Sequence, residues 1–143
     1  MIERTLAILK PDCLKKKLTG KVLDKLLDEG FMIVSMKMVK LTPATAGEFY
    51  AVHRGRPFFK NLVNFMTEGE IIPLVLERDD AINELRRVIG ATDPAEAAPG
   101  TIRKMYAENK QNNIIHASDG PETAKTEIAF FFSVKELLEN KVL

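Results

Sequence analysis

The sequence predicts an open α/β sandwich of the split βαβ kind, with helices on one face of the sheet. Short apolar runs typical of strands alternate with segments of helical periodicity, in the order β-α-β-α-α-β-α-loop-β-α. No Asn-Gly hairpin turn joins two strands. The chain has 143 residues, 45% of them hydrophobic and 29% charged, so we expect one domain with a proper core.

Residues 3–10 form a short apolar run bounded by charge, which predicts a buried strand. Pro11 ends it, because proline biases the preceding residue towards extended geometry. Residues 19–29 have the 3.6-residue period of a helix, with Gly30 as its C-cap. Residues 31–41 alternate in character and predict a strand with one better-buried face.

The middle of the chain predicts two short helices and a third strand. The first helix covers residues 44–53 with Thr42 as N-cap, and a second helical piece, 58–66, follows the break at Arg54 to Pro57. Residues 71–77 form the strand, and Pro73 within it predicts an edge position or a bulge.

A helix over residues 79–89 closes at Gly90 and is followed by a long segment, 91–113, that is rich in small and polar residues. It contains a helical turn from Thr101. Connections this long are uncommon in compact domains and are usually functional. The chain ends in a tail with a helical turn at residues 134–138.

Residues 113–127 are expected to form a short strand ending in a histidine, a tight turn and a helix. Asp119 is the predicted N-cap, Glu122 completes a capping box, and Pro121 lies in the first turn. Glu127 lies beside the apolar stripe of this helix, so its carboxylate can reach back to the preceding strand.

This segment brings together three reactive side chains: His116, Ser118 and Glu127. A neutral imidazole is a good nucleophile when a carboxylate orients its other nitrogen. The alternative is a structural histidine, which is common at strand ends.

The glycine-rich phosphate motifs G-x-x-x-x-G-K-[ST] and G-x-G-x-x-G are absent, and so is the zinc motif H-E-x-x-H. A phosphate site in this chain would therefore use side chains, although each candidate can also be a solvated surface group. The candidates are Lys10, Arg86, Arg103, Tyr50 and Thr92.

The formal net charge of +1 gives no reason to expect nucleic-acid or membrane binding. No apolar run approaches membrane-spanning length, and the N-terminus lacks a signal-peptide core. Cys13 is the single cysteine, so neither an internal disulfide nor a cysteine metal cluster can form. We expect a cytoplasmic protein.

Five segments, in order and with matching spacing, resemble the nucleoside diphosphate kinases over essentially the whole chain. The most specific motif is the last, N-x-x-H-[GA]-S-D. The segments are E-R-T-L-A-I-L-K-P-D (3–12), F-Y-A-V-H-R-G-R-P-F-F (49–59), R-R-V-I-G-A-T-D-P (86–94), P-G-T-I-R (99–103) and N-I-I-H-A-S-D (113–119).

The resemblance implies one domain, 1–143, with a ferredoxin-like αβ sandwich of the α+β type: a four-stranded antiparallel sheet with helices packed on it. It implies ping-pong transfer of the γ-phosphoryl from a nucleoside triphosphate, mainly ATP, to a nucleoside diphosphate. By the same resemblance His116 carries the phosphoryl group on its pros nitrogen, Glu127 orients the imidazole and Ser118 joins their hydrogen-bond network.

The resemblance also assigns the nucleotide site and the partners. Mg²⁺ would bridge the β and γ phosphates, with Asp119 contacting it through water. The protein would be a homo-oligomer, a hexamer in preference to a tetramer, with the 91–113 segment between subunits. The phosphate contacts would be Lys10, Tyr50, Arg86, Thr92 and Arg103, the sugar contacts Asn113 and Lys10, and the base contacts Phe58, as stacking platform, and Leu62.

Two positions depart from the family pattern. Ala117 replaces a frequent glycine, which requires negative φ at that residue. Lys110 lies where an apolar residue often closes the base site, so base affinity is expected to differ.

Two alternatives remain. A ferredoxin-like binding or regulatory module would not need Lys10, Arg86, Arg103 and His116 to converge. A further role on DNA or in signalling finds no support in the near-zero net charge.

Overall fold

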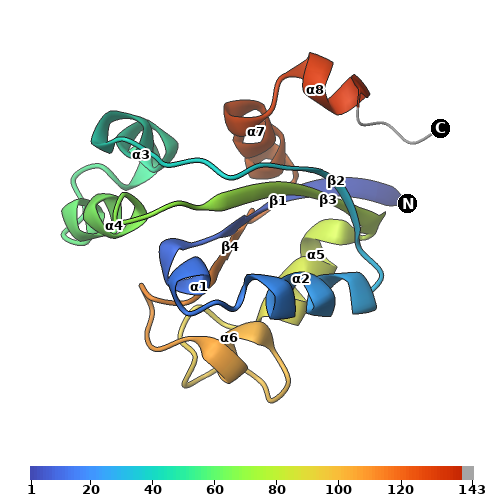
Figure 1. Cartoon of the computed structure of the whole chain (residues 1–143), viewed down its shortest axis with the longest axis horizontal. Coiled ribbons are helices and arrows are strands. Elements are labelled where there is room, and N and C mark those ends of the chain that lie inside the picture. Colours follow the sequence, from blue (N-terminus) through green and yellow to red (C-terminus); the bar gives the residue numbers. More distant parts are fainter. Residues whose placement is uncertain (140–143) are drawn as a thin grey trace.

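The computed structural model describes residues 1–139. Its centre is a four-stranded antiparallel sheet in the order β2-β3-β1-β4 (Figure 1). The predicted fold class is confirmed. The strands are β1 (Ile2–Leu9), β2 (Met32–Met36), β3 (Ile72–Asp79) and β4 (Ile115–Ala117). The helices are α1 (Pro11–Lys15), α2 (Thr19–Asp28), α3 (Pro43–Phe49), the 3₁₀ turn η1 (Ala51–His53), α4 (Phe59–Met66), α5 (Ala81–Ile89), α6 (Ile102–Tyr106), α7 (Pro121–Phe131) and α8 (Val134–Glu139). The last four residues of the predicted tail, 140–143, lie outside the described residues.

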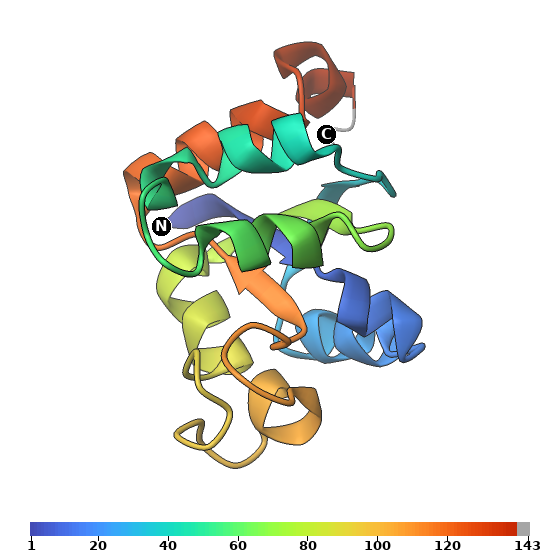
Figure 2. The same cartoon turned by 90° about the vertical axis from the view of Figure 1, so that its left-hand side faces the viewer.

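Helices cover both faces of the sheet, so the prediction of helices on one face alone is wrong. Ala7 and Leu9 of β1 pack in one core with α2, α5 and α6. Leu6 and Ile8 pack in a second core with α3 and α4. Successive side chains of a strand point to opposite faces, and the continuous apolar run of β1 reflects burial on both sides. Figures 1 and 2 show the two helical layers, with α3 and α7 side by side in one of them.

β4 places the predicted nucleophile on the α3 and α7 side. Ile115 and Ala117 belong to the core with α2 and α5. His116 lies between them and therefore points to the opposite face. The fold thus aims the imidazole at the layer that carries Tyr50 and Glu127.

Pro73 lies in the interior of the sheet, so its predicted edge position is wrong. It is opposite Ile8 in the β1–β3 pairing. The Pro73 carbonyl accepts a hydrogen bond from the Lys37 N–H at 3.2 Å. The Pro73 nitrogen, which has no hydrogen to donate, therefore also faces β2. β2 ends at Met36, one residue before Lys37. The proline is tolerated because the pairing with β2 is interrupted where its N–H would be required.

The strict alternation predicted for residues 31–41 is also wrong. A register shift lies between Ile33 and Ser35, and Val34 and Ser35 are both buried. The extra residue changes which side chains face the core. Three methionines are left exposed on this outer strand or just after it: Met32, Met36 and Met38.

The first strand leads directly into α1, a helix that the sequence reading missed. Lys10 precedes it with extended geometry, at φ −80° and ψ 167°, and Pro11 follows at the first helical position. Proline there begins a helix as well as ending the strand, because its missing N–H has no partner within the first turn.

α7 begins two residues after the predicted cap. Gly120 precedes Pro121, and the Gly120 N–H donates to the Thr123 hydroxyl at 2.9 Å. The predicted capping box of Asp119 and Glu122 is therefore wrong. Asp119 instead accepts a hydrogen bond from Arg86 at 3.0 Å, which takes its carboxylate away from the helix.

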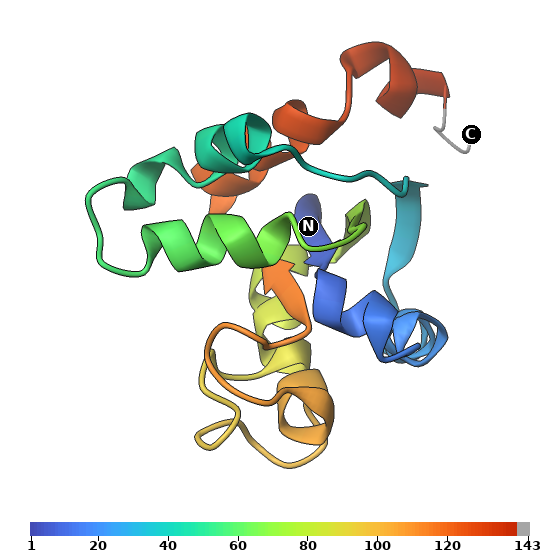
Figure 3. The ribbon, with the colours of Figure 1, turned by 60° about the vertical axis from the view of Figure 1, so that its left-hand side comes forward.

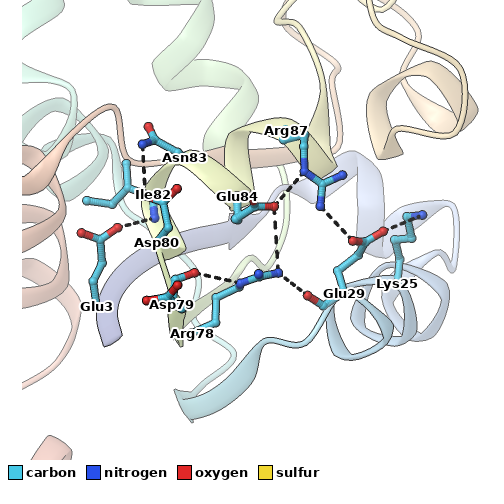
Figure 4. A network of polar contacts seen from close by, with 10 residues as sticks. All are labelled: Glu3, Lys25, Glu29, Arg78, Asp79, Asp80, Ile82, Asn83, Glu84 and Arg87. Atoms are coloured by element: carbon cyan, nitrogen blue, oxygen red, sulfur yellow. Dashed lines mark hydrogen bonds and ion pairs between the residues drawn. The ribbon is translucent and has the colours of Figure 1, made fainter. Parts of the chain in front are cut away.

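A polar network fixes α5 against its neighbours (Figure 4). The Arg87 guanidinium donates to Glu84 at 2.7 Å and to Glu29, at the end of α2, at 3.0 Å. The Ile82 N–H, in the first turn of α5, donates to the Glu3 carboxylate of β1 at 2.8 Å. The helix that carries Arg86 is thus joined to α2 and to the sheet. Within residues 1–139 no helix is long and apolar enough to cross a membrane.

Candidate active site

The centre of the site is a hydrogen-bonded group of three side chains. His116 Nε2 lies 2.8 Å from Glu127 Oε1, and the Ser118 hydroxyl donates to the same oxygen at 2.8 Å. Burial raises the pKa of Glu127, but the bonds from His116 and Ser118 outweigh it and hold that pKa below its ordinary value. An ionised Glu127 accepts a hydrogen bond from the protonated Nε2 of His116, which leaves the lone pair of the ring on Nδ1.

Tyr50 lies beside this group. Its ring centroid is 6.2 Å from that of His116, nearly perpendicular to it. In the described part of the chain the buried Tyr50 hydroxyl has no hydrogen-bond partner. Burial raises the Tyr50 pKa, and the charge of Glu127 raises it further. A neutral donor therefore lies unpaired near the imidazole, which suits an absent anionic ligand.

Two buried cations meet at the start of β4. Lys10 is 6% exposed, and its ammonium donates to Asn113 Oδ1 at 2.7 Å. Arg103 is 8% exposed and donates to three backbone carbonyls, of Ile115 at 2.7 Å, Gly90 at 3.1 Å and Asn113 at 3.4 Å. Neutral oxygens hold both cations, so neither charge has a directly bonded carboxylate among the described residues.

The electrostatics follow from this burial. Desolvation lowers the Lys10 pKa to about 8, and the charge of Arg103 adds to the decrease. Desolvation likewise lowers the Arg103 pKa to about 10, with a further contribution from Arg86. Buried cations held by neutral oxygens are stabilised by an added anion, so the arrangement is a preformed anion site.

The backbone between these groups is strained. Ile114 has φ of +75°, which is unusual for a β-branched residue, and the Ile115 N–H closes a γ-turn onto the Asn113 carbonyl at 2.8 Å. Asp12 accepts the Ile114 N–H at 3.0 Å, and the Lys10 N–H donates to the Ile114 carbonyl at 2.9 Å. Sequence reasoning missed Asp12 and Ile114. The Pro-Asp pair opening a helix was the signal for Asp12, and no local signal marks Ile114.

Arg86 reaches the site from α5. It donates to Asp119 at 3.0 Å, and the Asp119 side chain is 82% exposed. Arg86 is the residue before Arg87, and the two turn to different sides of the helix. Arg87 points to the α2 network (Figure 4). Arg86 points towards Asp119, near the start of α7. Arg86 therefore supplies a half-exposed cation beside the Asp119 carboxylate.

The remaining predicted residues lie around this centre. Thr92 is exposed, and its carbonyl accepts the Asn113 side-chain N–H at 3.2 Å. Phe58 is 47% exposed at the start of α4, and Leu62 follows one turn later, partly buried in the core beneath. Within residues 1–139 neither Phe58 nor Leu62 forms a hydrogen bond or ring contact with the cations. Lys110 is exposed.

Ala117 meets the condition that its methyl group sets. Among the described residues, positive φ outside glycine occurs at Lys17, Asp80 and Ile114. The strained position is thus Ile114, and Ala117 keeps the ordinary geometry of β4.

The residues fit a magnesium ion that arrives with a substrate. Within 1–139 no group of three histidine, cysteine, aspartate or glutamate side chains could hold a metal. Mg²⁺ commonly keeps several waters and binds one or two carboxylates together with substrate phosphates. The exposed carboxylate of Asp119, an oxygen donor at the rim of the anion site, is suited to that arrangement.

A cavity in the described part of the chain lies elsewhere. It has a volume of about 750 Å³ and is bounded by α1, the turn between α4 and β3, and the loop before β4, with Leu14, Phe65 and Gly69 among its lining residues. Of the polar residues that organise the site, it includes only Asp12. The candidate active site is identified instead by two buried cations that bind residues 113–115 and by the carboxylate-bound histidine that follows them.

Comparison with known proteins gives one consistent result. The model of the nucleoside diphosphate kinase family matches residues 3–137. A nucleoside diphosphate kinase of Chloroherpeton thalassium is 57% identical over 139 residues, 97% of this chain and 99% of the relative. The solved nucleoside diphosphate kinase of Aquifex aeolicus superposes with a TM-score of 0.93 at 51% identity, covering 95% of this chain and 99% of that one. The Halobacterium salinarum enzyme, solved in complex with CDP, gives 0.91 at 38% identity, covering 95% and 91%.

Gly90 offers a test of how the 91–113 segment is attached. A Cβ at Gly90 would lie 2.5 Å from Thr101 Oγ1 and 2.8 Å from Thr101 Cβ, and its φ is +89°. Gly90→Ala would displace Thr101, which caps α6, and the Gly90 carbonyl to which Arg103 donates. We expect a loss of unfolding free energy above about 1 kcal/mol, measured by urea denaturation.

Gly100→Ala is the matched control. Gly100 has a similar φ of +85° but no atom within 4 Å of an added Cβ, so it isolates the backbone strain from the clash. Equal destabilisation by the two substitutions would refute the close approach of Gly90 and Thr101.

Proposed function

Since this chain belongs to the nucleoside diphosphate kinase family of phosphotransferases, we propose that it transfers the γ-phosphoryl of a nucleoside triphosphate, mainly ATP, to a nucleoside diphosphate through a phosphohistidine at His116. The observation that carries this proposal is that Lys10 and Arg103 bind the short segment to which His116 belongs. All three contact or belong to residues 113–116.

The hydrogen bond to Glu127 supports Nδ1, the pros nitrogen, as the nucleophile. With its proton on Nε2, the imidazole attacks the γ-phosphorus with the Nδ1 lone pair. The N–P bond forms while the bond from the γ-phosphorus to the bridging oxygen breaks, and the nucleoside diphosphate leaves with that electron pair. Glu127 stabilises the positive charge that develops on the ring. In the second half-reaction a diphosphate oxygen attacks the same phosphorus and the lone pair returns to Nδ1.

The cations supply most of the catalysis in this proposal. Phosphoryl transfer passes through a loose transition state with charge spread over the phosphoryl oxygens, so positioning and electrostatic stabilisation dominate. Lys10 and Arg103 are already desolvated, and Arg86 is available at the rim. Tyr50 supplies an unpaired hydroxyl and Thr92 a further one. Asp119 would hold Mg²⁺ through water, and the ion would supply positive charge to neutralise the phosphates.

The nucleoside is held at two further points. Asn113 and Lys10, already bonded to each other, bind the sugar hydroxyls. The half-exposed ring of Phe58 stacks on the base, with Leu62 beside it. Stacking on one aromatic face accepts any base, so we expect low base specificity. The CDP complex of the Halobacterium salinarum relative supports a nucleotide site of this kind.

His116→Ala should abolish phosphoenzyme formation, because no other group offers a carboxylate-oriented imidazole. The measurement is incubation with γ-labelled ATP, followed by detection of an acid-labile, base-stable label on the protein. His53→Ala, at the other of the two histidines, is the control and should still label stoichiometrically. Undiminished labelling of the His116 variant would refute the assignment.

Lys10 gives the proposal a pH dependence of known sign. Its pKa of about 8 in the free protein means that it carries charge below pH 8 and loses it above. ADP should therefore bind with constant affinity below pH 8, and its dissociation constant should rise about tenfold per pH unit above it. Isothermal titration calorimetry from pH 7 to 9.5 measures this. A flat profile would remove Lys10 from the phosphate site.

We also propose a homo-oligomer, a hexamer in preference to a tetramer. The 91–113 segment projects from the side of the sheet that carries α5 (Figure 3), and many of its residues are exposed. The outer strand β2 exposes Met32 and Met36 beside an edge that no other described strand pairs, and Met38 is exposed just after it. A neighbouring copy would cover this surface. Sedimentation velocity should give a hexamer at micromolar concentration, and a fully active monomer at nanomolar concentration would contradict the assembly.

A further inference from the structure

A ring cluster formed by Phe49, Phe130 and Phe131 adjoins the imidazole of His116. Phe49, the last residue of α3, packs edge-on against His116 with ring centroids 5.5 Å apart and planes at 72°. The same ring contacts Phe130 at 5.2 Å and Phe131 at 5.1 Å. No step of the proposed reaction uses Phe49.

The cluster connects the two partners of the His116–Glu127 hydrogen bond. Phe130 and Phe131 follow Glu127 by three and four residues on α7, so all three share one face of that helix. Phe49 touches that face and the imidazole at once. The Phe49 ring therefore helps to set the distance between β4, which carries the nucleophile, and α7, which carries the carboxylate.

His116 needs such a second restraint. β4 has three residues and, among the strands of residues 1–139, pairs with β1 alone, so the backbone holds the histidine weakly. One hydrogen bond from Nε2 fixes a point on the ring but leaves the direction of Nδ1 adjustable. An aromatic contact restricts rotation of the ring, because edge-to-face pairs prefer a limited range of distances and angles.

We propose that Phe49 is a positioning residue for phosphoryl transfer: its ring holds the imidazole and the Glu127 helix in the geometry that directs Nδ1 at the phosphoryl group. This inference rests on the proposed function. Within residues 1–139 the Phe49 ring makes no cation-π contact with the cations that bind the nucleotide, so it should act on the chemical step and not on nucleotide affinity.

The competing explanation is that Phe49 merely fills space between α3 and α7. Phe131→Leu is the matched control, because Phe131 belongs to the same cluster and to the same core but makes no ring contact with His116 within residues 1–139. A space-filling role predicts that leucine at either position has the same effect. A positioning role predicts that only Phe49→Leu slows the reaction.

The experiment compares wild type, Phe49→Leu, Phe49→Tyr and Phe131→Leu. Single-turnover mixing with labelled ATP gives the rate of phosphoenzyme formation, calorimetry gives the ADP dissociation constant, and ¹⁵N NMR gives the tautomer of His116. Phe49→Leu should slow phosphorylation about five- to tenfold, leave the ADP dissociation constant unchanged and reduce the population protonated at Nε2. Phe49→Tyr and Phe131→Leu should both phosphorylate His116 at the wild-type rate.

An unchanged rate in Phe49→Leu, or equal slowing in Phe49→Leu and Phe131→Leu, overturns the inference while leaving a phosphorylated His116 intact. Absence of label on His116 in the wild type overturns the proposed function and this inference together. If Phe49→Leu does not fold, Phe49→Met has a more flexible side chain of similar size and is measured against the same outcomes.

Discussion

The site depends on the burial of two cations that have no directly hydrogen-bonded carboxylate among residues 1–139. Lys10 and Arg103 are almost fully removed from water, and their partners are the side chain and carbonyls of residues 113–115 together with the Gly90 and Gln111 carbonyls. Such burial costs stability, as the lowered pKa values of both groups indicate. A phosphate group repays that cost when it binds, so the free protein stores part of the binding energy as electrostatic strain.

The rest of the architecture maintains this arrangement. α1 begins immediately after Lys10, and its Asp12 binds the strained Ile114 backbone. Gly90 permits the close approach of Thr101, which begins the helix that carries Arg103. The unusual conformation of Ile114 lies between the residue that binds Lys10 and the strand that carries His116. Backbone strain of this kind persists only where surrounding contacts over-determine it, and it is concentrated at functional sites.

Helical periodicity was sufficient to predict that Glu127 reaches back to the strand of His116, since a single helix and a single turn define that contact. The family and its fold were recognised from five segments and are confirmed. The edge position of Pro73, the N-cap role of Asp119 and the placement of helices on one face were predicted wrongly. Each feature depends on partners distant in sequence: the end of β2, the guanidinium of Arg86 and the burial of β1 on both faces. Nothing local could indicate the positive φ of Ile114 or the contact of Phe49 with His116. The catalytic and binding roles of the site residues stay predictions.

The central claim is that Glu127 occupies Nε2 of His116 and leaves Nδ1 as the nucleophile. Phosphorus and nitrogen NMR of the protein phosphorylated by ATP, with ¹⁵N-labelled histidine, tests it most directly, because the coupling pattern identifies the phosphorylated nitrogen. The account predicts a phosphoryl group on the pros nitrogen, Nδ1, with Nε2 still protonated beside Glu127. A phosphoryl group on Nε2, or on a residue other than His116, would contradict it.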